Sequence, residues 1–162
     1  MSNVPVSVLS IRTQKREGYP CPFEYGDFLI EGKPLALAAQ FLQEYPHFDD
    51  IGCLGFGSER FQREQIERLL LDGEADFPND RRSLYICPAC GDLGCGAVSV
   101  RIHREKKCFV WSDFGIQSHP SLEPHIILCP WIGPFYFEET AYAETIRASY
   151  GLGGFHWPYP AK

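Results

Sequence analysis

The sequence predicts an α+β protein, a single domain with a mostly antiparallel sheet and two or three helices. The chain has 162 residues, about the size of one domain, and 44% of them are apolar, which is enough to build a core. Short stretches that alternate apolar and polar residues are typical of strands, and longer stretches with helical spacing lie between them. We expect one α+β domain over residues 1–150 and an aromatic, Gly- and Pro-rich tail over residues 151–162.

The first half of the chain is expected to combine short strands with two helices. Val6 and Val8 alternate with polar neighbours, which predicts a strand near residues 5–12. Residues 23–30 predict a short hairpin, because Gly26 and Asp27 interrupt them. A helix over 35–44 follows Pro34, a strand is expected over 51–56, and the clearest helix covers 59–72. Its predicted N-cap is Ser58, and its predicted buried face holds Phe61, Ile66, Leu69 and Leu70.

The second half of the chain predicts a hairpin between further strands. Residues 83–87 and 126–129 read as short strands. Strands over 97–103 and 108–113 are joined by a turn at 104–107, with Val98, Val100 and Ile102 on one face. A last helix over 137–149 is expected to turn Tyr142 and Ile146 inward.

Charge and hydropathy exclude several classes of partner. The net charge is −6, which argues against nucleic acid binding. The longest apolar run, 126–132, is far shorter than the roughly 20 residues of a membrane span. The N-terminus has no apolar core or cleavage site of a secretory signal, so we expect a soluble, cytoplasmic protein that does not bind membranes.

Acidic residues are concentrated between residues 44 and 80. This segment has ten acids and three bases, a net charge of −7, which leaves +1 for the rest of the chain. A patch of this kind steers a basic partner protein toward it. The alternative is a solvated helix face with internal pairs such as Glu64 with Arg68. The acids are Glu44, Asp49, Asp50, Glu59, Glu64, Glu67, Asp72, Glu74, Asp76 and Asp80.

The seven cysteines fall into two groups. An odd number in a chain without an export signal indicates thiols rather than a disulfide framework. Four of them, Cys21, Cys53, Cys108 and Cys129, stand singly, and we expect them to be small buried residues. The other three lie within nine residues of one another.

Residues 86–96, Ile-Cys-Pro-Ala-Cys-Gly-Asp-Leu-Gly-Cys-Gly, have the form of a zinc knuckle. Two residues between Cys87 and Cys90 let both thiolates reach one ion, and Cys95 supplies a third ligand. A structural zinc ion needs a fourth ligand, and a second Cys-x-x-Cys pair is absent.

The hairpin ranks the candidates for that fourth ligand. In the expected register, His103 and Cys108 lie beside the turn, roughly 26 Å from Cys95 and out of reach of its metal. The same register puts residue 116 opposite Cys95, so that His119 returns to the correct end. The predicted metal site is therefore Cys87, Cys90, Cys95 and His119, with Asp92 as a second candidate for the fourth ligand.

Other interpretations of these cysteines stay open. Cys87 and Cys90 could form a thiol–disulfide pair, although such motifs usually open a helix and the glycines here indicate a loop. Cys95 and His119 could form a nucleophile pair, but no oxyanion donor is identifiable. A tight glycine turn with buried cysteines needs neither metal nor redox chemistry. An iron–sulfur cluster would need a fourth local cysteine.

Three segments carry a resemblance to a known family: 84–97 with its Cys-Pro-x-Cys-Gly-Asp-x-Gly-Cys-Gly loop, 110–115, and 133–137 followed by Tyr142. They are similar to an uncharacterised family of small bacterial proteins, some of which are loosely described as oxidoreductases. The likeness covers residues 70–150 and implies a bacterial, cytosolic protein.

Two functions are predicted from these observations. The first is a non-catalytic binding protein, in the manner of an immunity-type inhibitor of a cognate toxin, whose acidic 44–80 region meets a basic protein surface and whose cysteine loop binds structural zinc. The alternative is a small thiol-redox or zinc-dependent enzyme that uses Cys87, Cys90 and Cys95.

Overall fold

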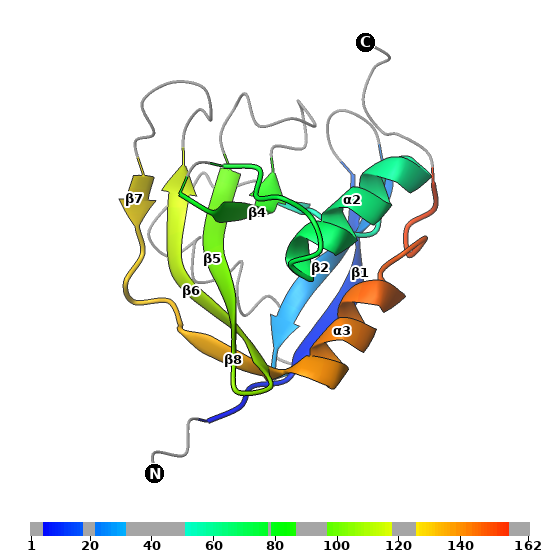
Figure 1. Ribbon diagram of the computed structural model, residues 1–162. Coiled ribbons are helices and arrows are strands. Elements are labelled where there is room, and N and C mark those ends of the chain that lie inside the picture. The colour runs from blue at the N-terminus through cyan, green and yellow to red at the C-terminus, as the bar shows by residue number, and fades with distance from the viewer. Residues whose placement is uncertain are drawn as a thin grey trace.

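The computed structural model describes residues 5–17, 22–31, 51–77, 79–86, 97–117 and 126–155. Within these ranges the chain forms strands that pair in antiparallel ladders and two helices that lie side by side (Figure 1). The predicted α+β class with a mostly antiparallel sheet is therefore confirmed. The elements are β1 (Leu9–Arg16), β2 (Phe23–Ile30), β3 (Ile51–Gly52), α2 (Glu59–Leu69), β4 (Arg81–Ile86), β5 (Ala97–Glu105), β6 (Cys108–Gln117), β7 (Ile126–Leu128), β8 (Phe135–Glu138) and α3 (Glu139–Ala148).

The larger sheet has the order β3-β4-β5-β6-β7, and β8 also pairs with β6. The length of β6 makes this branching possible. Its first residues, 108–111, pair with β8, and its last residues, 115–117, pair with β7 on the same edge. Strands β1 and β2 form a separate antiparallel pair.

Single backbone bridges connect the two sheets. The N–H of Gly26 in β2 donates to the carbonyl of Leu54 just after β3, at 2.8 Å. The N–H of Ser7 just before β1 donates to the carbonyl of Tyr136 in β8, also at 2.8 Å. The strands thus follow one another around a ring. Gly52 permits this closure, because a Cβ atom there would lie 2.2 Å from the Gly26 carbonyl oxygen.

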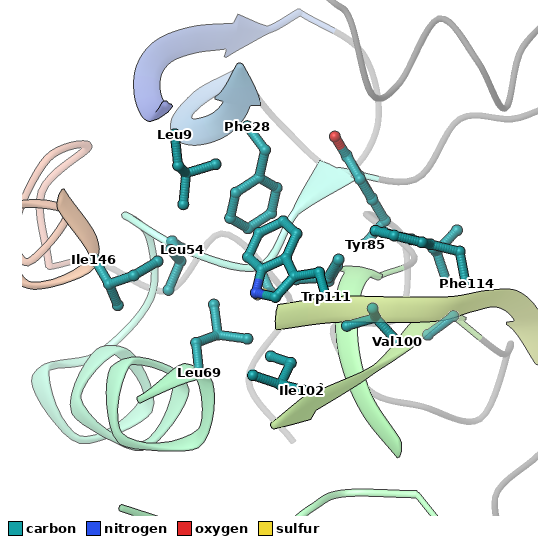
Figure 2. Packing of buried hydrophobic residues seen from close by; sticks show 14 of the residues in the cluster. Leu9, Phe28, Leu54, Leu69, Tyr85, Val100, Ile102, Trp111, Phe114 and Ile146 are labelled. Carbon is teal, nitrogen blue, oxygen red and sulfur yellow. The ribbon is translucent and has the colours of Figure 1, made fainter. Parts of the chain in front are cut away.

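Trp111 of β6 lies at the centre of the core. It is fully buried and meets Phe28, Phe137 and Tyr142 edge-on, at ring-centroid distances of 5.5, 5.0 and 6.0 Å. Figure 2 shows its ring beside Phe28, with Leu69 of α2 facing the same interior. Edge-to-face contacts of this kind add to the burial energy of aromatic side chains.

A buried tyrosine joins the sheet to both helices. Tyr142 of α3 accepts a hydrogen bond from Trp111 Nε1 at 3.0 Å and donates one to the Leu69 carbonyl of α2 at 2.7 Å. Its ring stacks on Phe109 at 4.4 Å. Burial raises the pKa of the Tyr142 hydroxyl well above its usual range. The hydroxyl therefore stays neutral and satisfies a donor and an acceptor that would otherwise be buried without partners.

Both helices begin with side-chain caps. Ser58 Oγ accepts the N–H of Phe61 at 3.1 Å, as predicted for the N-cap of α2. The carboxylate of Glu138 accepts the N–H groups of Thr140 and Ala141 at the start of α3, and these bonds lower the pKa of Glu138. No helix within the described ranges is long and apolar enough to cross a membrane.

Most predicted elements are present, with shifted ends. The buried faces predicted for 97–103 and for the last helix are confirmed by Val98, Val100, Ile102, Tyr142 and Ile146. The strand expected near 5–12 instead runs over Leu9–Arg16, and β8 was not predicted. The hairpin expected over 23–30 is wrong, because β2 is one continuous strand there. The helix expected over 35–44 lies outside the described residues.

Candidate functional site

Four strand ends lie side by side at one edge of the larger sheet. Ile86 pairs with Ala97, Ala97 with Gln117, and Gln117 with Ile126. We call these four residues the strand-end row. The chain segments 87–96 and 118–125, which connect these strands in sequence, both begin and end at this row.

The predicted metal ligands Cys87, Cys90, Cys95 and His119 are all in these two segments, and all lie outside the described residues. Their tethers are short. Cys87 directly follows β4, Cys95 stands two residues before β5, and His119 stands two residues after β6. Two residues span at most about 7 Å, and paired Cα atoms of an antiparallel ladder are about 5 Å apart. The strand ends that directly precede or follow the tethers of Cys87, Cys95 and His119 are therefore neighbours in the sheet. Asp92 also lies outside the described residues.

The register of the β5–β6 hairpin differs from the expected one. The turn is tighter, with Glu105 opposite Cys108 and only two residues between them. A bulge between Ser99 and Arg101 then shifts the pairing by one more position. As a result, Gln117 rather than residue 114 stands opposite Ala97, which changes the predicted partner of Cys95 without changing the end of the hairpin to which His119 belongs.

Cys108 lies at the turn end of the hairpin, as the sequence predicts. Cys108 begins β6 and lies beside the turn, whereas the strand-end row is at the other end of this ten-residue strand. At about 3.3 Å per residue the two ends are roughly 30 Å apart. His103 lies opposite Val110 and is likewise remote from the row.

Two of the single cysteines are buried, as predicted. Cys53 has no exposed surface, and its thiol donates to the Ser83 carbonyl at 3.6 Å. Burial raises the pKa of the Cys53 thiol to about 12, which favours the protonated thiol at neutral pH. Cys129 is also buried, and Cys108 is half-buried. Cys21 is outside the described residues. In the part of the chain that the structure covers, no group of three or more His, Cys, Asp or Glu could hold a metal ion.

The acidic segment is described from residue 51 onward, apart from residue 78, so Glu44, Asp49 and Asp50 are not covered. Its arginines are engaged within the chain. Arg60 pairs with Glu64 at 2.9 Å, and Arg63 with Glu59 at 3.6 Å. The predicted pair of Glu64 with Arg68 is wrong, because Arg68 turns toward Asp76 at 3.6 Å.

Asp76 belongs to the interior rather than to a solvated face. Its carboxylate accepts the N–H of Ser83 at 3.0 Å and the Ser83 hydroxyl at 2.5 Å. Nearby, the buried Arg82 donates to the carbonyls of Arg68 and Gly73. A cation at these carbonyls stabilises the C-terminal end of α2.

Three acids of the segment have no ion pair among the described residues: Glu67, Asp72 and Glu74. We call them the acidic corner. They are neighbours, because the chain after α2 folds back so that the N–H of Asp72 donates to the Glu67 carbonyl at 2.9 Å, while Arg68 Nε donates to the Glu74 carbonyl at 3.2 Å.

A mixed cavity opens beside the acidic corner. Its volume is about 340 Å³, and it lies between the end of α2, the turn end of β5–β6 and the outer face of α3. Asp72 belongs to its lining, together with Leu70, Phe109 and Glu144. Sequence patterns do not reveal this cavity, because it forms only where three elements meet.

Sequence reasoning also missed a buried polar pair. Asp27 of β2 is 3% exposed, and its Oδ1 accepts the N–H of Phe28 at 2.8 Å and the hydroxyl of Tyr85 at 3.1 Å. Burial raises the pKa of Asp27, although both hydrogen bonds oppose this effect. A carboxyl directly before the apolar run 28–30 is the signal that could have pointed to it.

A buried cation lies in the sheet as well. Arg81 is 3% exposed and donates to the hydroxyl and carbonyl of Ser99 and to the carbonyl of Asp113. Burial lowers its pKa. These bonds span the bulge in β5 and join three strands, which gives Arg81 a structural role.

Comparison of the chain with protein-family models, with curated proteins and with solved structures finds no match to any of them.

Proposed function

We propose that the chain is a small, cytoplasmic, non-catalytic binding protein whose acidic corner meets a basic surface of a partner protein, in the manner of an immunity-type inhibitor. The observation that carries this is the distribution of charge around α2. All three arginines of the helix are already paired with carboxylates of the chain, so Glu67, Asp72 and Glu74 contribute negative charge that has no ion-pair partner among the described residues. Such a patch accelerates encounter with a positive partner.

The experiment compares two charge-reversal variants of equal net charge. Wild-type protein, Glu67→Lys/Glu74→Lys and Glu17→Lys/Glu24→Lys are immobilised and exposed to a lysate of the source cells. The control carries the same substitutions at exposed sites outside the acidic segment. We expect a basic protein that is retained by wild type and by the control, is lost from the acidic-corner variant, and is released by salt.

A retained protein is then identified, purified and titrated against the same three forms. The proposal requires its affinity to fall with rising salt and to fall at least tenfold for the acidic-corner variant. Equal affinity for all three forms, or the absence of any partner that distinguishes them, contradicts the proposal.

We also propose a structural zinc ion held by Cys87, Cys90, Cys95 and His119. The support is the convergence of their tethers on the strand-end row, together with the soft thiolate ligands that zinc prefers. Elemental analysis should find about one zinc per chain, and a chelator should release three additional reactive thiols. Cys108→Ser should keep the metal, and His119→Ala should weaken its binding. Protein without metal and with all thiols reactive contradicts this site.

A further inference from the structure

We propose that the cavity beside the acidic corner receives an arginine side chain of the partner protein. This inference rests on the proposed function, because it assigns a specific contact to the same acidic surface. It starts from the shape and lining of the cavity. Its volume of about 340 Å³ exceeds that of one side chain, and its mostly polar lining also includes the apolar residues Leu70, Phe109 and Ala143. Apolar side chains of this kind pack against the methylene groups of a long side chain.

The charges around the cavity favour a cation. Asp72 and Glu144 belong to its lining, and neither has an ion pair within the described ranges. Glu67 and Glu74 of the acidic corner add negative charge next to Asp72. A guanidinium in the cavity would find carboxylates from two different elements, the end of α2 and the middle of α3, which suits its planar array of donors.

Two arginines also line the cavity, and they do not reverse its preference. Arg104 is ion-paired with Glu139, and its guanidinium lies 5.0 Å from the centre of the Phe109 ring. The pair is neutral as a unit. Arg147 also belongs to the lining, and together with Asp72 and Glu144 it leaves the lining with a net charge of −1. Arg104 further shows that this wall accommodates a guanidinium between a carboxylate and an aromatic face.

The experiment uses short blocked amino acids as probes and NMR shifts as the readout. N-acetyl-arginine amide, N-acetyl-citrulline amide and N-acetyl-glutamate amide are titrated into the full chain. Citrulline has nearly the shape of arginine without its charge, and glutamate tests whether Arg147 makes the cavity an anion site instead. We expect saturable shifts at Leu70, Phe109 and Ala143 with the arginine probe, and at least tenfold weaker binding of the citrulline probe.

Matched variants test the two carboxylates. Asp72→Asn/Glu144→Gln should weaken binding of the arginine probe at least fivefold, and Glu17→Gln/Glu24→Gln, with the same change in net charge, should leave it unchanged. All four side chains are exposed, so both variants should fold. Equal binding of arginine and citrulline, stronger binding of glutamate, or the absence of saturable shifts at these residues overturns the proposal.

Failure of this inference can be told apart from failure of the proposed function. One outcome is a partner that fails to bind Glu67→Lys/Glu74→Lys but binds Asp72→Asn/Glu144→Gln as tightly as wild type. That result would support the proposed function and contradict arginine binding in the cavity. Saturable arginine binding in the cavity, without any partner whose binding depends on the acidic corner, would support the arginine site and contradict the proposed function.

Discussion

The two ends of the β5–β6 hairpin each lie near a buried tyrosine, and the two tyrosine hydroxyls have hydrogen-bond partners of different kinds. Near the turn end, Tyr142 exchanges hydrogen bonds with the indole of Trp111 and the carbonyl of Leu69, all of which are neutral. Next to the strand-end row, Tyr85 donates to the carboxyl of Asp27. The side chains at both places are almost completely buried.

The comparison separates two ways of holding the ring of strands together. Neutral hydrogen bonds and aromatic packing contribute the same stability at any ordinary pH. A buried carboxyl contributes stability that depends on its protonation. In our proposal the strand-end row also depends on zinc, so this end should respond to pH and to chelators and the turn end should not.

The largest effect is expected from the centre of the core. Trp111→Ala should reduce the free energy of unfolding by about 3–5 kcal/mol, because it removes a fully buried ring and leaves a cavity. Trp131→Ala, at a side chain that is 49% exposed, should change it by about 0.5 kcal/mol or less. Urea denaturation measures both. Similar losses of unfolding free energy for the two variants would contradict the central place of Trp111 in the core.

A chelator should have the next largest effect, and only at one end. Zinc at 1,000 times its dissociation constant contributes about 4 kcal/mol, which EDTA would remove. Amide hydrogen exchange should then speed up at Ala97 and Gln117 more than at Trp111. Cys108→Ser should lose stability in EDTA as wild type does. Cys95→Ser should unfold at a lower temperature than wild type, and EDTA should not lower that temperature further. Unchanged melting of the wild type in EDTA would contradict the zinc proposal.

Removal of the Tyr142 hydroxyl should have an intermediate effect. Tyr142→Phe leaves the buried N–H of Trp111 and the carbonyl of Leu69 without this partner, which should cost about 1–3 kcal/mol. Tyr150→Phe removes an exposed hydroxyl that bonds to Glu59 and should cost about 0.5 kcal/mol or less. Thermal unfolding of the two variants measures this difference. Equal stabilities would mean that the Tyr142 hydroxyl, which links the sheet to the helices, contributes nothing to the free energy of unfolding.

The sequence predicts the fold best where apolar residues stand at alternate positions. In β5, Val98, Val100 and Ile102 follow this pattern and all three are buried, so the existence of the strand follows from the sequence. Strand β2 was misjudged because Gly26 and Asp27 are turn residues by local rules. Their partners here are distant in sequence, since Gly26 pairs with Leu54 and Asp27 with Tyr85. Such partners are visible only once the strands are assembled.

The candidate site is predictable in part for the same reason. Cysteine spacing predicts local ligands, and the hairpin pattern predicts the end of the sheet at which β6 finishes, two residues before His119. The one-residue bulge at Ser99 and Arg101 has no clear sequence signal, so the exact register could not be predicted. The cavity beside Asp72 depends on how α2, α3 and the hairpin pack, and tertiary contacts of this kind leave no periodic pattern.

The smallest effect should come from the ionisation of Asp27, and it should depend on pH. Because burial raises the folded-state pKa of Asp27, the folded protein keeps this proton at pH values where the unfolded chain has released it. The resulting stability is fully present below the unfolded pKa, near 3.8, and is lost as the pH rises through the folded pKa.

Asp27→Asn tests this sign directly, because its amide oxygen can still accept from Tyr85 and Phe28 but does not titrate. The free energy of unfolding of wild type minus that of Asp27→Asn should fall as the pH rises from about 4 toward neutrality. Asp113→Asn, at an exposed residue with a left-handed backbone that asparagine tolerates, should follow the wild-type pH profile. Parallel profiles for wild type and Asp27→Asn would mean that Asp27 makes the strand-end side of the molecule no more sensitive to pH than the neutral cluster around Tyr142.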